Sequence, residues 1–215
     1  MALSQPFPTR PPAPASARSI GPDLTDGELV ARARRGDGQA REELARRCRR
    51  PAYLLALQLL RDPDDALDVA QDALLRVFTH LDGFEPGRSV QPWLCTIVRN
   101  RARDLQRSRR RRPLEPLAGA EGESRREVID RAPGPEATAA GHQLQARVWR
   151  MLAELPAAQR EILVLRDYQD LSYDEIAGVL GVPLGTVMSR LHRARKALKE
   201  LLVADGLTAA GASDG

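Results

Sequence analysis

The alternation of apolar and polar residues is clearest in residues 171–198, LSYDEIAGVLGVPLGTVMSRLHRARKAL. Ser172 and Glu175 form a capping box that predicts a helix start, and Gly181 supplies the positive φ that ends this helix. A second helix is predicted after a three-residue turn, and it carries one apolar stripe made of Val187, Leu191, Ala194 and Leu198. Two short helices joined by a tight turn indicate a helix-turn-helix, whose usual ligand is DNA.

The polar side of the second helix carries cationic and hydrogen-bonding side chains. Such groups suit phosphates and the edges of bases. The residues on or beside this face include Thr186, Ser189, Arg190, His192, Arg193 and Lys196. A solvated charged helix in an ordinary bundle is the competing interpretation.

A second amphipathic segment is predicted to run from Asp62 to about His80, because Asp62 can cap it and Pro63 suits the first helical position. Its apolar stripe is Ala66, Val69, Ala70, Ala73, Leu74 and Val77. The opposite side carries Asp65, Asp68, Asp72 and Leu75. An exposed leucine among acids favours a protein-binding face, although a solvated acidic face with one stray leucine fits the pattern equally well.

The same segment contains a DDxxD arrangement in Asp64, Asp65 and Asp68, which in isoprenoid synthases binds magnesium and a diphosphate. Those enzymes need a large helical bundle around an apolar cavity and a second acidic motif, and this short segment offers neither. A capped helix start is the simpler interpretation, and no metal or cofactor is expected.

A third segment, from Trp93 to about Arg112, predicts a helix with an arginine stripe opposite its apolar side. The stripe consists of Arg99, Arg103, Arg107 and Arg110. Aligned guanidinium groups repel one another, so they favour a polyanionic ligand over self-stabilisation, with a solvated basic face as the alternative. The preceding loop, residues 82–91, carries Arg88, Ser89 and Gln91, which suit an unstacked base.

The composition indicates small helical units, because only 4% of the 215 residues are aromatic and 29% are charged. The expected fold class is all-α, with two small helical domains joined by a flexible acidic linker and a helix-turn-helix in the second. The expected division is an N-terminal tail (1–22), a first domain (23–112), the linker (113–140), a second domain (141–203) and a C-terminal tail (204–215). In the second domain, helices 142–155 and 157–166 are predicted before the helix-turn-helix, separated at Pro156.

Two cysteines, Cys48 and Cys95, are too few and too far apart to indicate a disulfide framework or a zinc site. Two reduced thiols are the expected state. No apolar run reaches membrane-spanning length and no signal peptide is recognisable, so a cytoplasmic protein without membrane insertion is expected.

Three motifs together resemble bacterial RNA polymerase sigma factors of the extracytoplasmic-function (ECF) group, in the sigma-70 family. They are LDVAQDALLRVF (67–78), WLCTIVRNRARDLQR (93–107) and LPAAQREILVLRDYQDLSYDEIAGVLGVPLGTVMSRLHRARKAL (155–198). The resemblance covers nearly everything between Asp23 and Leu202. It implies a first domain that grips core polymerase and opens the minus-10 element, and a second that reads the minus-35 element.

The resemblance also implies roles for individual residues. Binding to the clamp of the largest polymerase subunit would involve Asp65, Asp68, Gln71, Asp72 and Leu75. Contacts to the minus-10 region would come from Arg88, Ser89, Gln91, Trp93, Arg99, Asn100, Arg103 and Arg107. Contacts to the minus-35 element would come from Thr186, Met188, Ser189, Arg190, His192, Arg193 and Lys196.

Further partners implied by the resemblance are promoter DNA, the flap of the second-largest polymerase subunit and an anti-sigma factor. No catalytic residue is implied, because the polymerase performs the chemistry. This sequence departs from the family pattern at Pro183, where a Ser-type helix cap is common, at Met188, where a basic or polar residue is common, and at Pro92 in the base-capturing loop.

The main rival interpretation is a helix-turn-helix transcription factor of the response-regulator type, because residues 159–187 resemble those DNA-binding domains almost as well. Its first half should then be a receiver domain, in which apolar strands alternate with helices. No such alternation precedes residue 112. A magnesium-dependent diphosphate enzyme built on the DDxxD arrangement is the second rival.

Overall fold

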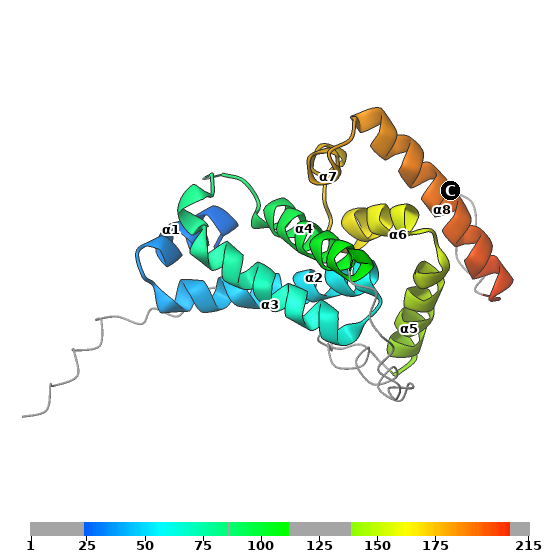
Figure 1. Cartoon of the computed structure of the whole chain (residues 1–215), viewed down its shortest axis with the longest axis horizontal. Helices are drawn as coiled ribbons and strands as arrows, with labels where there is room; N and C mark the ends of the chain where they lie inside the picture. The colour runs from blue at the N-terminus through cyan, green and yellow to red at the C-terminus, as the bar shows by residue number, and fades with distance from the viewer. Residues whose placement is uncertain (1–23, 86, 112–138, 207–215) are drawn as a thin grey trace, which may run out of the picture.

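A computed structural model describes residues 24–85, 87–111 and 139–206, and every regular element in these ranges is helical. Figure 1 shows two groups of helices, an N-terminal group of α1 to α4 and a C-terminal group of α5 to α8. The predicted all-α fold class is therefore confirmed. None of the described helices combines the length and hydropathy that crossing a bilayer requires.

The N-terminal group starts with α1 (Asp26–Arg34) and α2 (Gly38–Leu60). Thr25 begins α1 with a capping box, in which its hydroxyl accepts the Glu28 N–H at 3.3 Å and Glu28 accepts the Thr25 N–H at 2.8 Å. The carboxylate of Asp37 caps α2 by accepting the N–H groups of Gln39 at 3.0 Å and Ala40 at 3.2 Å. The two helices pack on each other and on the rest of the N-terminal group.

The next helix, α3 (Pro63–Thr79), follows the predicted course. Asp62 accepts the N–H groups of Asp64 and Asp65, each at 3.0 Å, which confirms the predicted helix cap. The side buried against α2 and α4 is formed by Ala66, Val69, Ala70, Ala73 and Val77, and Leu74 is half-buried. The short 3-10 turn η1 (Leu81–Gly83) then leads into a loop.

The helix α4 (Val90–Arg111) begins earlier than the predicted Trp93. Two side chains stabilise this earlier start: the Ser89 hydroxyl accepts the Gln91 N–H at 3.2 Å, and Asp26 accepts the Val90 N–H at 2.9 Å. Pro92 therefore lies in the first helical turn, where its missing N–H leaves no intrahelical bond unmade.

The C-terminal group contains four helices and one π-helical stretch. These are α5 (Ala139–Glu154), α6 (Ala157–Leu163), the stretch η3 (Val164–Tyr168), α7 (Tyr173–Leu180) and α8 (Leu184–Ala204). The first helix starts earlier than the predicted residue 142, and the predicted helix 157–166 divides into α6 and η3. The rings of Trp149 and Tyr168 pack at 4.2 Å between centroids and join α5 to η3.

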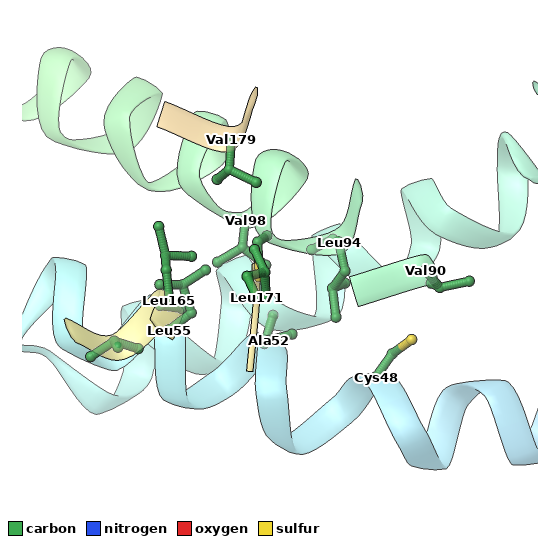
Figure 2. Packing of buried hydrophobic residues seen from close by; sticks show 14 of the residues in the cluster. Cys48, Ala52, Leu55, Val90, Leu94, Val98, Leu165, Leu171 and Val179 are labelled. Carbon is green, nitrogen blue, oxygen red and sulfur yellow. The ribbon is translucent and has the colours of Figure 1, made fainter. Parts of the chain in front are cut away.

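Buried residues of both groups belong to one hydrophobic cluster. Figure 2 shows Leu165, Leu171 and Val179 of the C-terminal group beside Leu55 and Val98 of the N-terminal group. The two groups are therefore in direct contact. The predicted N-terminal tail, most of the predicted linker and most of the predicted C-terminal tail lie outside the described residues.

Both cysteines are free and buried in the N-terminal group. Cys48 lies on α2 and Cys95 on α4. Burial raises the pKa of each thiol to about 12, with a smaller contribution from the charge of Asp26 at Cys48. Both thiols are therefore protonated at neutral pH.

Candidate nucleic-acid and protein interfaces

The connection between α7 and α8 has the predicted helix-turn-helix geometry. The Ser172 hydroxyl accepts the Glu175 N–H at 3.3 Å, Glu175 accepts the Ser172 N–H at 2.8 Å, and Gly181 ends α7 with φ 66°. Pro183 is the N-cap of α8 and supplies no side-chain hydrogen bond there. Its carbonyl instead accepts the Thr186 N–H at 2.9 Å.

Helix α8 has one buried side and one open side. Val187, Leu191 and Ala194 are buried, as the periodicity predicts. The residues exposed on the other side include Met188, Ser189, His192, Arg193 and Lys196, while Thr186 and Arg190 are partly exposed. All seven candidate DNA-contacting residues of this helix are thus brought together on one accessible surface.

The outer side of α3 combines acids with an apolar residue. Leu75 is 63% exposed, and Asp68 and Gln71 are exposed beside it. Asp65 and Asp72 are partly covered, because Arg109 pairs with the first and Arg101 with the second. The exposure that the sequence predicts for Leu75 is therefore confirmed.

A groove of about 580 Å³ runs between α3 and α4. The residues that line it are Asp65, Asp68, Val69, Gln71, Asp72, Arg101, Asp104, Leu105 and Ser108. Four of the five candidate polymerase-binding residues thus share one surface that carries both signs of charge. In the described part of the chain no group of three or more His, Cys, Asp or Glu residues is arranged to hold a metal ion.

The loop before α4 is held in place by α1. The Arg34 guanidinium donates to the Leu81 carbonyl at 2.8 Å and to the Phe84 carbonyl at 2.5 Å. Arg88 is exposed and pairs with Glu85 at 2.8 Å, and Ser89 is exposed next to it. Trp93 is only partly exposed, because its ring packs against Phe84 with 5.6 Å between centroids.

Helix α4 carries three of its candidate DNA-contacting residues on an open surface. Asn100, Arg103 and Arg107 are exposed, and Arg107 lies 3.8 Å from Asp104 in a loose ion pair. Arg110 is exposed as well, so the predicted stripe is open along the C-terminal half of the helix.

The expectation that Arg99 continues this open stripe is wrong for the arrangement seen here, because Arg99 is only 8% exposed. Its guanidinium pairs with Glu161 at 2.7 Å and donates to the carbonyls of Val179 at 3.1 Å and Leu180 at 3.3 Å. These carbonyls end α7 and lack intrahelical partners, so a buried cation satisfies them. Helix periodicity places Arg99 on the side of α4 opposite its apolar residues. It cannot predict that α7 packs against α4 at Arg99.

A second buried arginine, Arg160, also connects the two groups, and it is 4% exposed. It donates to the carbonyl of Gln58 near the end of α2 at 2.8 Å, and to the carbonyls of Ala153 and Leu155 near the end of α5, each at 3.1 Å. Burial, and secondarily the charge of Arg61, lowers its pKa from the ordinary value. One guanidinium thus caps helix ends from both groups.

Gln169 makes further polar contacts between the groups. Its amide nitrogen donates to the Pro51 carbonyl at 3.0 Å, and its amide oxygen accepts from the Gln91 side chain. Sequence reasoning missed Arg160, Glu161 and Gln169, and no local pattern marks them, because their partners lie far away along the chain. Asp26 and Arg34 lie on α1, whose start could be predicted from the capping-box spacing of Thr25 and Glu28. That spacing predicts the helix but not the contacts of these two side chains.

Known proteins match this chain along most of its length. The family models described as Sigma-70 region 2 and Sigma-70, region 4 match residues 44–112 and 145–198, respectively. The RNA polymerase sigma-H factor of Pseudomonas aeruginosa is 32% identical over 180 residues, which cover 82% of this chain and 93% of that protein. The ECF RNA polymerase sigma factor EcfG of Rhodopseudomonas palustris is 36% identical over 159 residues, covering 74% and 83%.

Among solved structures, the sigma factor RpoE of Bartonella quintana, in a co-crystal with the anti-sigma factor NepR, has a TM-score of 0.59 to this chain. The two sequences are 29% identical, and the match covers 76% of this chain and 97% of the other. The likeness includes helices of both groups.

Proposed function

Because the chain belongs to the ECF group of the sigma-70 family, we propose that its two helical groups bind different parts of the transcription machinery and the promoter. The chain is a transcription initiation factor that binds core RNA polymerase and directs it to promoters with minus-10 and minus-35 elements. Residues 23–112 form the domain for polymerase and the minus-10 element. Residues 141–203 form the domain for the minus-35 element.

The observation that carries this proposal is the opposite chemistry of two exposed surfaces. The outer side of α3 presents acids around Leu75, whereas the outer side of α8 presents Arg193 and Lys196. An acidic surface with a central leucine suits a protein partner, and a basic helix surface suits the major groove of DNA. One chain that bears both can connect a protein to a DNA site.

The minus-35 element is read, in this proposal, by the open side of α8. Its early residues Thr186, Met188 and Ser189 enter the major groove, and Arg190, His192, Arg193 and Lys196 contact bases or phosphates farther along. Met188 is 49% exposed and offers an apolar contact, such as one to a thymine methyl group.

The minus-10 region is contacted by α4 and the loop before it. Arg88 and Ser89 in the loop, together with Gln91 and Trp93 in the first turn of α4, contact an unstacked base. Farther along α4, Arg99, Asn100, Arg103 and Arg107 contact the adjoining DNA backbone. Of these residues of α4, Asn100, Arg103 and Arg107 have exposed side chains.

Core polymerase binds, in this proposal, to α3 and the groove beside it, through Asp65, Asp68, Gln71, Asp72 and Leu75 on the clamp of the largest subunit. The C-terminal group binds the flap of the second-largest subunit. An anti-sigma factor is a further proposed partner, since a similar structure holds one. The chain acts in the cytoplasm, where polymerase and chromosome are, and it catalyses no reaction itself.

Run-off transcription on fragmented genomic DNA of the source organism, with core polymerase with and without the chain, tests the function. Discrete transcripts that need the chain, and that share two upstream elements at fixed spacing, are expected. Sequence-specific DNA binding by the chain alone without new transcripts would instead indicate a helix-turn-helix regulator.

Binding to core polymerase tests the α3 assignment. Asp68→Ala combined with Leu75→Ala is expected to weaken polymerase binding at least about tenfold. Both side chains are exposed on the same side of α3, and the double substitution removes a charged and an apolar contact there. Glu42→Ala is the matched control, because it also removes one exposed carboxylate from the N-terminal group, but from α2 and outside the proposed surface. Unchanged binding by the folded Asp68/Leu75 variant would contradict the assignment.

A further inference from the structure

Helix α1 contacts both ends of the loop that the proposed function assigns to an unstacked minus-10 base. We infer that α1 fixes the conformation of this loop, and that Asp26 and Arg34 are positioning residues that determine which base the loop accepts. The inference rests on the proposed function for the role of the loop, and on the structure for the contacts that hold it. Helix α1 precedes residue 44, where the match to Sigma-70 region 2 begins.

The loop is buried at both ends and exposed between them. Phe84 is 7% exposed and Val90 is 2% exposed, whereas Glu85, Arg88 and Ser89 are exposed. Between the described residues of this exposed stretch, the backbone makes one hydrogen bond, from the Arg88 N–H to the Glu85 carbonyl at 3.4 Å. The conformation of the loop therefore depends on contacts from other elements.

The guanidinium of Arg34 holds the first end of the loop. It donates to the carbonyls of Leu81 at 2.8 Å, Asp82 at 3.0 Å and Phe84 at 2.5 Å. One planar group with several fixed donors thus fixes three carbonyls within four residues. A lysine ammonium is a point charge on a flexible stem and cannot replace this geometry.

The carboxylate of Asp26 holds the second end. It accepts the Val90 N–H at 2.9 Å and the Ser89 hydroxyl at 3.3 Å. The Val90 N–H lies in the first turn of α4 and has no partner within that helix, so one carboxylate fixes both the end of the loop and the helix start. Between the two ends, a Cβ atom built on Gly27 would lie 3.4 Å from the Gly87 nitrogen, so the backbone of α1 also passes close to the exposed stretch.

A loop fixed in this way distinguishes bases better than a mobile one. Polar groups of Arg88 and Ser89 can favour one base edge over another only while they are held in place, because a mobile loop adapts to several bases. Loss of a contact from α1 should therefore reduce base selectivity more than overall affinity. Polymerase binding through α3 and minus-35 binding through α8 use other surfaces and should not change.

Four substitutions test these contacts one at a time. Arg34→Ala releases the first end of the loop, and Asp26→Ala releases the second. Arg34→Lys keeps a cation on α1 but loses the planar donor geometry. Arg35→Ala is the matched control, because Arg35 is the neighbouring exposed arginine and its side chain makes no hydrogen bond or ion pair with the described loop residues. Circular dichroism verifies that each variant keeps its helical content.

The first readout is the mobility of the loop in the full-length chain alone. A nitroxide label on Glu85→Cys reports this mobility by electron paramagnetic resonance, and the buried native thiols stay unlabelled. We expect a more mobile label after Arg34→Ala, Arg34→Lys or Asp26→Ala, and no change after Arg35→Ala. Unchanged mobility in the folded Arg34 and Asp26 variants would overturn the role of α1 in fixing the loop.

The second readout is base selectivity, measured with polymerase holoenzyme containing each variant. The probes are single-stranded oligonucleotides with the non-template minus-10 sequence of a promoter found by run-off transcription, each position carrying in turn the four bases or an abasic site. At the captured position, the unsubstituted chain should prefer one base by about tenfold or more, and the Arg34→Ala, Arg34→Lys and Asp26→Ala variants by less than about threefold. Affinity for the abasic oligonucleotide should change by less than about twofold, because phosphate contacts remain.

Three results would overturn the positioning role. The first is an equal loss of affinity for all oligonucleotides with unchanged selectivity, which indicates a structural effect only. The second is full selectivity in Arg34→Lys, which would mean that the charge matters and the geometry does not. The third is a loss of selectivity in Arg35→Ala as large as that in Arg34→Ala.

A further variant separates this inference from the proposed function. Arg88→Ala with Ser89→Ala removes the polar side chains of the loop that are assigned to the base. If this variant loses selectivity while the α1 variants keep it, the loop assignment stands and the role of α1 is wrong. If the Arg88/Ser89 variant also keeps full selectivity, the loop assignment itself fails, and the role of α1 in base choice fails with it.

Discussion

Helices α4 and α8 are two basic amphipathic helices of nearly equal length, 22 and 21 residues, with different surroundings. The candidate DNA side of α8 is accessible from Thr186 to Lys196, whereas that of α4 is interrupted by the buried Arg99. In Figure 1, α8 lies at the edge of the molecule and α4 lies beside α7. Amphipathic periodicity distinguishes the inner side of a helix from its outer side, but the outer side can still face another domain.

The largest expected effect separates a buried arginine from an exposed one. Arg160→Ala should lower the free energy of unfolding by about 3 kcal/mol, because two buried carbonyls and one partly buried carbonyl at two helix ends lose their donor. Arg193→Ala, on the open side of α8, should change it by less than about 0.5 kcal/mol. Urea unfolding followed by circular dichroism measures both. A loss below about 1 kcal/mol for Arg160→Ala would contradict the capping role.

The two buried thiols report on the N-terminal group alone. Their pKa values of about 12 lie above the ordinary value of 9.0, so the stability they contribute is fully present below pH 9 and is lost as the pH rises through 12. From pH 8 to 10 the two thiols together should lower the free energy of unfolding by about 3 kcal/mol.

The measurement is the urea midpoint against pH, with Cys48→Ala combined with Cys95→Ala as the control that removes this part of the slope. Because one hydrophobic cluster spans both helical groups, we expect a single transition that shifts as a whole. Two transitions, of which only one depends on pH, would show that the groups unfold separately.

A smaller effect distinguishes base reading from phosphate binding on the two helices. Arg193→Ala should weaken minus-35 binding about tenfold and relax its sequence preference, as for a lost base contact. Arg103→Ala on α4 should weaken DNA binding for all sequences and reduce the slope of log affinity against log salt by about 1. Promoter binding by the polymerase holoenzyme over a salt series measures both. If log affinity depended on log salt with the same slope in both variants, Arg193 and Arg103 would not differ as base-reading and phosphate-binding residues.

The smallest effect compares how α7 and α8 begin. Ser172→Ala should lower the free energy of unfolding by about 1 kcal/mol, because it removes the capping box of α7. Pro183→Ala should cost about 0.5 kcal/mol, since Pro183 gives α8 no side-chain cap and contributes only through its restricted backbone. Thermal unfolding of the two variants measures the difference. Equal losses would mean that the Ser172 cap adds little.

Local patterns predicted several elements well. The start of α3 at Asp62, the capping box at Ser172 and the left-handed Gly181 are confirmed because each depends on neighbours within a few residues. The buried stripe of α8 is confirmed for the same reason. The start of α4 was predicted too late, because Val90 is held by Asp26, a residue that lies 64 positions earlier in the chain.

The sequence by itself determined the helices, their caps, the helix-turn-helix and the family, since these depend on residue types at short spacing. The tertiary structure decided which side chains are available. Arg99 and Arg103 are alike in sequence and one helical turn apart, yet one is buried against α7 and the other is exposed. The physical reason is that Glu161 and the carbonyls at the end of α7 come within hydrogen-bonding distance of Arg99 only after the two helical groups pack together.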